Sequence, residues 1–143
     1  TGEIVEGLAI IHYKKAPSHK SGHGSGGATA CYTYLSNGAK WKNVEPWVVN
    51  PANLDGLSST AVFDLLTSGI AKWEDATDGN VGNTLGVDVL GTGATSSATL
   101  VADTTSPDNQ NEVYFADIAN SNTIAVTIVW GVFSGPTFNR KLV

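Results

Sequence analysis

Charged residues are scarce in this chain, and basic residues are the scarcest of them. The 143 residues include 8 Lys and Arg against 13 Asp and Glu, so the formal net charge is −5. Binding of nucleic acid depends on basic side chains that neutralise phosphates, and this composition therefore argues against a nucleic-acid partner. The polar surface must come from neutral residues, of which there are 15 Thr, 12 Ser, 11 Asn and 16 Gly. Such a surface is typical of secreted β-rich proteins.

Cysteine is scarce, and long apolar runs are missing. Cys31 is the only cysteine in these 143 residues, so no disulfide can form among them. A partly buried thiol is favoured over a bond to another chain or to a segment outside these residues. The longest apolar run, 124–132, is interrupted by Thr127 and has about half the length of a membrane span, so we expect none. The N-terminus has neither an initiator Met nor a basic and apolar leader, as in a mature secreted chain. These features predict an extracellular protein.

The motifs of hydrolytic and metal sites do not occur either. A zinc protease carries HExxH on a helix and an α/β-hydrolase carries GxSxG, and neither is found in these residues. The histidines are His12, His19 and His23. The last two lie in a Gly/Ser-rich loop without a nearby acidic or Cys partner, so a solvated loop is favoured over a metal site. We therefore assign no catalytic, cofactor-binding or metal-binding residue, and no cofactor.

Two acidic groups are the remaining candidates for a cation site. The first lies near the end of an expected helix and consists of Glu74, Asp75, Asp78 and Asn80. It lacks the twelve-residue spacing of an EF-hand loop, so a solvated cluster that ends the helix is favoured. The second consists of Asp103, Asp108 and Asn109. These residue types suit a turn better than a cation site.

One helix is expected, from about 59 to 76. Ser58 or Ser59 can cap its N-terminus, and Asp78-Gly79 can end it. Apolar residues recur at spacings of three and four, which places them on one face of a helix. The residues expected to face a sheet are Val62, Leu65, Leu66 and Trp73.

The remaining apolar segments predict strands. They cover 3–13, 41–50, 85–90, 98–102, 112–116, 123–133 and 137–143. Segment 123–133 is apolar on both faces, so we expect a central strand that is buried on both sides. Pro46 cannot donate to a ladder, so its strand either starts near Trp47 or lies at an edge. Gly7 marks a possible bulge in the first strand.

Together these elements predict an α+β fold in which a twisted mixed sheet is backed by one long helix. Residues 1–39 are expected to supply an N-terminal strand and a Gly/Ser/His-rich loop. Residues 40–143 are expected to form the sheet and helix as a half-domain.

Residues 40–77 resemble the opening of matrixin-like zinc metalloproteases of the metzincin group. The matching pieces are Lys40-Trp41, Trp47-Val48-Val49-Asn50-Pro51, the helical stretch 57–70 and Trp73-Glu74-Asp75-Ala76-Thr77. Segment 111–143 is similar to central strands of secreted archaeal members, and 1–39 is similar to the segment that precedes their protease fold. The resemblance implies the upper part of a zincin, with a mostly parallel sheet backed by the helix.

The zinc motif of that group, HExxHxxGxxH with a later Met turn, would lie beyond Val143. No catalytic or metal-binding residue is therefore carried over, and zinc is implied only for a segment outside these residues. Two functions remain open. The chain is either a catalytically inactive piece of such a protease, whose partner is the zinc-binding half, or a structural subunit of an extracellular filament or adhesin. In the second case copies would assemble by exchanging β-strands.

Overall fold

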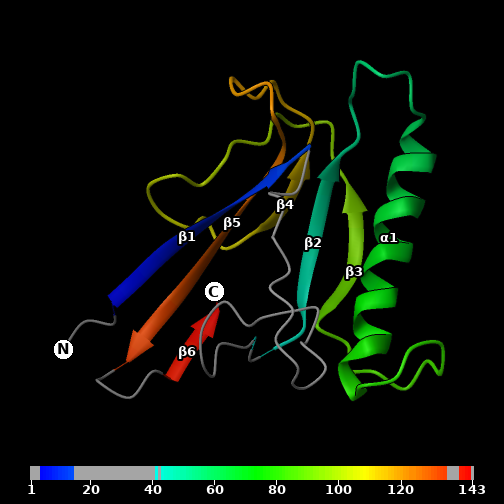
Figure 1. Ribbon diagram of the computed structural model, residues 1–143, viewed down its shortest axis with the longest axis vertical. Helices are drawn as coiled ribbons and strands as arrows, with labels where there is room; N and C mark the ends of the chain where they lie inside the picture. The colour runs from blue at the N-terminus through cyan, green and yellow to red at the C-terminus, as the bar shows by residue number, and fades with distance from the viewer. Residues whose placement is uncertain (1–3, 15–40, 42, 135–138, 143) are drawn as a thin grey trace, which may run out of the picture. The chain divides into compact units, whose positions relative to one another are not determined.

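The computed structural model describes residues 4–14, 41, 43–134 and 139–142. These residues include one α-helix and six strands, and the strands form two three-stranded sheets (Figure 1). The mixed α and β content expected from the sequence is confirmed, but one sheet is antiparallel and the other parallel. The chain divides into two compact units, one from 1–40 with 118–142 and one from 41–117. His19, His23 and Cys31 lie outside the described residues.

The antiparallel unit consists of β1 (Ile4–Tyr13), β5 (Thr123–Ser134) and β6 (Asn139–Leu142), in the order β1-β5-β6. β5 is central, as predicted, but it is not buried on both faces. Ile124 and Val126 are 60% and 45% exposed. A central position supplies hydrogen-bonding neighbours on both edges of a strand, whereas burial needs a second layer against its faces.

Pairing of β1 with β5 is regular through Gly7, where the sequence indicated a possible bulge. The irregularity lies between His12 and Tyr13, where Ile124 of β5 is the extra residue. Gly7 instead makes room for its cross-strand partner, because a Cβ at this position would lie 2.9 Å from the Trp130 ring. A packed indole therefore explains the glycine.

The parallel unit consists of β2 (Glu45–Asn50), α1 (Ser59–Asp75), a 3₁₀ turn (Ala76–Asp78), β3 (Leu90–Thr95) and β4 (Asn111–Tyr114). The strand order is β3-β2-β4, and α1 runs alongside this sheet (Figure 1). No helix in the described part of the chain is long and apolar enough to cross a membrane.

Pro46 lies inside β2, the central strand of this sheet. The sequence had predicted that the strand would either start near Trp47 or lie at an edge, and both alternatives were wrong. The pairing of β2 with β3 shifts register between Glu45 and Trp47, so the missing N–H of Pro46 falls within the irregularity. The Pro46 carbonyl accepts a hydrogen bond from the Asn111 side-chain amide at 3.0 Å. Proline is thus accommodated in β2 without an edge position.

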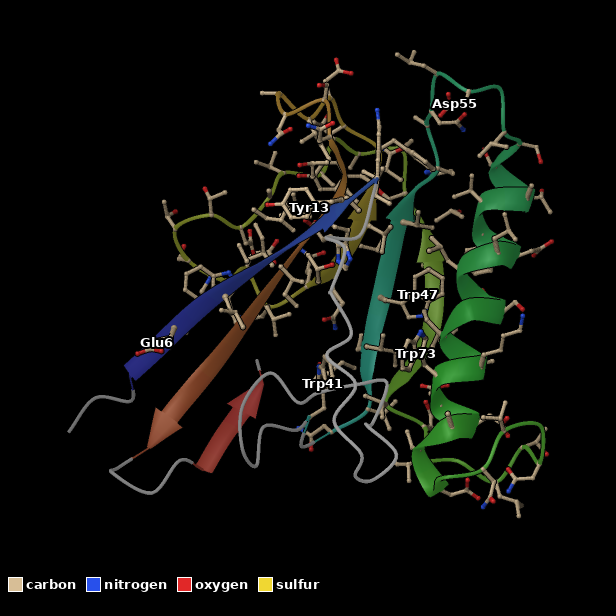
Figure 2. The ribbon with its side chains drawn as sticks, in the orientation of Figure 1. Glu6, Tyr13, Trp41, Trp47, Asp55 and Trp73 are labelled. Carbon is tan, nitrogen blue, oxygen red and sulfur yellow. The ribbon has the colours of Figure 1, made fainter. Side chains whose placement is uncertain are left out.

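The core of the parallel unit is built around Trp47. This side chain, Val49 of the same strand and Val62 of α1 are buried. Trp47 stacks on Phe63 with ring centroids 5.4 Å apart, and its indole N–H donates to the Gly91 carbonyl at 3.1 Å. The residues packed around the cluster are Phe63, Leu66, Ile70 and Leu90. Figure 2 labels Trp47 on β2.

The helix begins as predicted, but the predicted sheet-facing residues are only half right. The Ser58 hydroxyl accepts a hydrogen bond from the Ala61 N–H at 3.1 Å, which confirms the N-cap. Leu65 and Trp73 are 68% and 75% exposed. With about 100° of rotation per residue, Leu65 points well away from a face centred between Leu66 and Phe63. Trp73 follows Ile70, the last helical residue that packs on the core, so it extends past the cluster.

The strand between α1 and β4 is displaced from its prediction. Segments 85–90 and 98–102 were predicted as strands, but the regular strand is β3, which starts at Leu90. β3 contains Gly91 and Gly93. Glycine has a low β-propensity, so this segment was not predicted as a strand. Gly93 lies directly beside Trp47 in the sheet, and a Cβ there would clash with the indole ring.

Candidate functional site

The acidic residues at the end of α1 bind the backbone of the loop that follows them. One carboxylate oxygen of Glu74 accepts hydrogen bonds from the N–H groups of Val89 and Leu90, each at 2.8 Å. The two oxygens of Asp75 accept from the N–H groups of Gly82 and Thr84. These carboxylates therefore attach the loop 79–89 to the end of the helix.

Two further side chains complete this attachment. The Thr77 hydroxyl donates to the Glu74 carbonyl at 2.7 Å and accepts from the Val87 N–H at 2.6 Å. Asp78 accepts from the Asn83 side-chain amide and the Asn80 N–H, each at 2.8 Å, and these hydrogen bonds lower the pKa of Asp78. The acidic group was predicted to be a solvated cluster that ends the helix. It does more than that, because it binds the loop 79–89 to the end of the helix. In the described residues no three His, Cys, Asp or Glu side chains are placed to hold a metal ion.

The second acidic group forms the turn that leads into β4. Asp103 accepts from the Asp108 N–H at 2.8 Å, and Asp108 accepts from the Gln110 N–H at 2.9 Å. Asn109 has a φ of 66°, which suits its residue type in a turn. This arrangement places two carboxylates close to the first residues of β4.

The two carboxylates affect the pKa of Glu112 in β4. Partial burial raises the pKa of Glu112, and the negative charges of Asp108 and Asp103 raise it further. Glu112 pairs with Val48, and the burial of this pair is intermediate. Glu112 had not been predicted as a site residue from the sequence, in which the one signal is an Asp-rich turn immediately before a short strand.

We expect Glu112→Gln to stabilise the protein more at pH 7 than at pH 4. Because the folded-state pKa is raised, the stability contributed by Glu112 is fully present below the ordinary pKa of 4.5 and is lost as pH rises through the raised value. The Gln variant carries no such charge and removes the repulsion from Asp103 and Asp108. Urea denaturation at both pH values measures the difference, and an equal change at the two values would contradict it.

The free edge of β4 is the feature of the parallel unit that can bind another chain. Within the described residues β4 pairs with β2 alone, so its second edge presents backbone N–H and C=O groups. An extended peptide can add to such an edge as a further strand. A strand had been predicted at 112–116, but its position at the edge of a sheet does not follow from the sequence.

His12 is the one histidine in the described residues, and it has no acidic neighbours of the kind a metal site needs. Its ring nitrogen lies 3.1 Å from the Thr127 hydroxyl across the β1–β5 pair, in an exposed position. This is a cross-strand hydrogen bond of the kind that stabilises sheets. It gives His12 a structural partner and fixes its place on the sheet.

Comparison with known proteins leaves the family of this chain open. No protein-family model matches it, and neither a curated protein nor a solved structure does.

Proposed function

We propose that these residues form the non-catalytic, peptide-aligning part of an extracellular metzincin-type zinc metalloprotease. The parallel unit would be the zincin-like scaffold, and the zinc ligands would come from a segment outside these 143 residues. The resemblance of 40–77 supports the family, and the absence of HExxH from the residues printed above supports a scaffold without hydrolysis. The neutral, hydroxyl-rich composition supports an extracellular location.

The parallel unit is built in a way that supports further layers. Parallel sheets usually have both faces covered, and α1 packs on the face that carries Trp47 and Val49. Val48, Glu112 and Tyr114 occupy the opposite face, because residues paired across strands share a face. Their burial is intermediate. A second layer of protein against this face would complete a protease fold.

The single observation that carries the proposal is the second edge of β4 in the parallel sheet, with which no strand in the described part of the chain pairs. Proteases that bind extended substrates can hold them by backbone hydrogen bonds to a strand edge, with affinity independent of most side chains. β4 offers this edge, and the hydrogen bond from Asn111 to Pro46 fixes the start of the strand against β2. The edge is therefore held in place before a peptide arrives.

The purified chain should hold no stoichiometric zinc and cleave no peptide. Elemental mass spectrometry and a casein-cleavage assay test both expectations. Hydrogen–deuterium exchange with denatured casein should show added protection at β4 amides, and α1 amides serve as the internal control. Tightly bound zinc, cleavage, or equal protection of β4 and α1 would each refute the proposal.

A second candidate function is a structural subunit that assembles by strand exchange. The observation that favours it is β1, a ten-residue strand that lies at an edge among the described strands and whose exposed apolar residues are Val5, Leu8, Ile11 and Tyr13. Long exposed apolar edges promote pairing between chains. Electron microscopy should then show ordered filaments that disappear when residues 1–13 are deleted, and dispersed particles would reject this function.

A further inference from the structure

Among the strands that the structure describes, β1 pairs with β5 alone, and the hydrogen bonds of this pair define which backbone groups of β1 point to its other, outer edge. The Lys14 N–H donates to the Asn122 carbonyl at 2.8 Å, next to the Tyr13–Thr123 pair. The bulge is in β5, so the alternation along β1 continues, and even-numbered residues direct their backbone groups to β5. The odd-numbered residues of the strand therefore direct their N–H and C=O groups to the outer edge. They are Val5, Gly7, Ala9, Ile11 and Tyr13.

We propose that this edge pairs antiparallel with the same edge of a second copy, about a two-fold axis at Ala9. In this register all five outward-facing residues find partners. Ala9 pairs with Ala9 of the second copy, Gly7 with Ile11 of the second copy, and Val5 with Tyr13 of the second copy. Each of these is a hydrogen-bonded pair, so the backbone groups of the edge are satisfied over nearly the whole of β1.

The side chains support the same register by charge. Even-numbered residues form the non-hydrogen-bonded pairs, in which side chains approach most closely. Glu6 lies opposite His12 of the second copy, and the two-fold axis repeats this pair. Glu6 and His12 are both exposed, and Figure 2 labels Glu6 near the start of β1 and Tyr13 at its end. The two pairs therefore bring opposite charges together whenever His12 is protonated.

Shifted registers are less favourable. Moving the axis by one residue towards the N-terminus places Glu6 opposite Ile10 of the second copy, so its charge has no partner. Moving it by one residue the other way places Glu6 opposite Lys14 of the second copy but leaves Val5 without a partner in β1. The two charged registers make different predictions for charge-swap variants.

The two-fold axis also limits the assembly. An isologous contact uses the same edge of both copies and closes on itself. The product is a dimer with a six-stranded sheet in the order β6-β5-β1-β1-β5-β6. It differs from the open filament of the second candidate function, and it stands independently of the scaffold proposal because β1 belongs to the other unit.

Sedimentation equilibrium of the full 143-residue chain over a wide range of concentrations tests the dimer. In buffer of about pH 5.5, where histidine side chains are ordinarily protonated and glutamate side chains ionised, the wild-type chain should dimerise. Glu6→Lys should then raise the dissociation constant by about tenfold or more, since two attractive pairs become repulsive. The double variant Glu6→Lys with His12→Glu exchanges the two charges and should return the constant to within about threefold of wild type. Lys14→Glu should leave it unchanged.

Circular dichroism checks that each variant folds, and Glu6→Gln provides a milder change that should weaken the dimer less than Glu6→Lys. A monomer at every concentration overturns the proposal, as does a double variant that stays as weak as Glu6→Lys. Loss of the dimer in Lys14→Glu would select the shifted register and reject the axis at Ala9. Filaments would reject closure. None of these outcomes alters the zinc, cleavage or β4 exchange results that test the scaffold.

Discussion

Trp47→Ala should lower the free energy of unfolding by about 3–5 kcal/mol, as truncation of a buried aromatic side chain usually does. Trp47 is 5% exposed, and it contacts both layers of the parallel unit. Its loss removes the stack on Phe63, leaves the Gly91 carbonyl without the indole donor and opens a cavity beside Gly93. Urea denaturation followed by circular dichroism measures the change, because fluorescence would be altered by the loss of the tryptophan itself.

Trp73→Ala is the matched control on the helix. The same side chain is removed, but Trp73 is largely exposed, and substitutions at such positions usually change stability by less than about 0.5 kcal/mol. The sequence analysis had assigned Trp73 to the sheet-facing side of the helix. A large loss for Trp73→Ala would restore that assignment, and a small loss for Trp47→Ala would refute the central role of Trp47.

The helix could be read from the sequence because its signals are local. A serine cap and a three-to-four spacing of apolar residues depend only on residues within a few turns of one another. The side of the helix that is buried depends on what lies opposite. Phe63 packs because Trp47 of β2 provides a ring to stack on, and no pattern within the helix itself distinguishes Phe63 from Leu65.

β3 was predicted at the wrong position because its glycines contact Trp47, which is distant in the sequence. Gly91 supplies the carbonyl that accepts the Trp47 indole, and Gly93 leaves space for the ring. Read along the chain, the same glycines indicate a turn or loop. Segment 85–90, which is richer in apolar residues, ends as a loop because Glu74 and Thr77 bind its backbone.

The acidic groups show the same division between local and distant information. Glu74, Asp75 and Asp78 stand out in the sequence as a carboxylate cluster, and their hydrogen bonds to the following loop do not. Most of their partners are backbone N–H groups up to sixteen positions away, and any residue type except proline supplies such a group. Sequence patterns therefore cannot identify them. The edge positions of β1 and β4 among the described strands could not be predicted from the sequence for a related reason. Strand order depends on the whole sheet, and no single strand encodes it.

Gly86→Ala should destabilise the protein by about 1–3 kcal/mol, as overpacking in a well-packed site does. A Cβ at this position would collide with the Glu74 carbonyl and would lie 2.8 Å from the Asp75 Cα. These are backbone atoms at the end of α1, so they cannot move aside as a flexible side chain would. The loop must shift instead, which would strain the hydrogen bonds from Val87 and Val89 to the helix end. Thermal and urea denaturation measure the loss.

Gly69→Ala is the matched control, and we expect the opposite sign. Gly69 lies inside α1, and a Cβ there meets no atom within 4 Å. Alanine in a helix interior is more stable than glycine by about 0.5–1 kcal/mol, because glycine loses more backbone freedom on folding. The two variants add the same methyl group, so their difference isolates the contact between the loop and the helix end. Stabilisation by both substitutions would show that residues 79–89 do not pack against α1 as described.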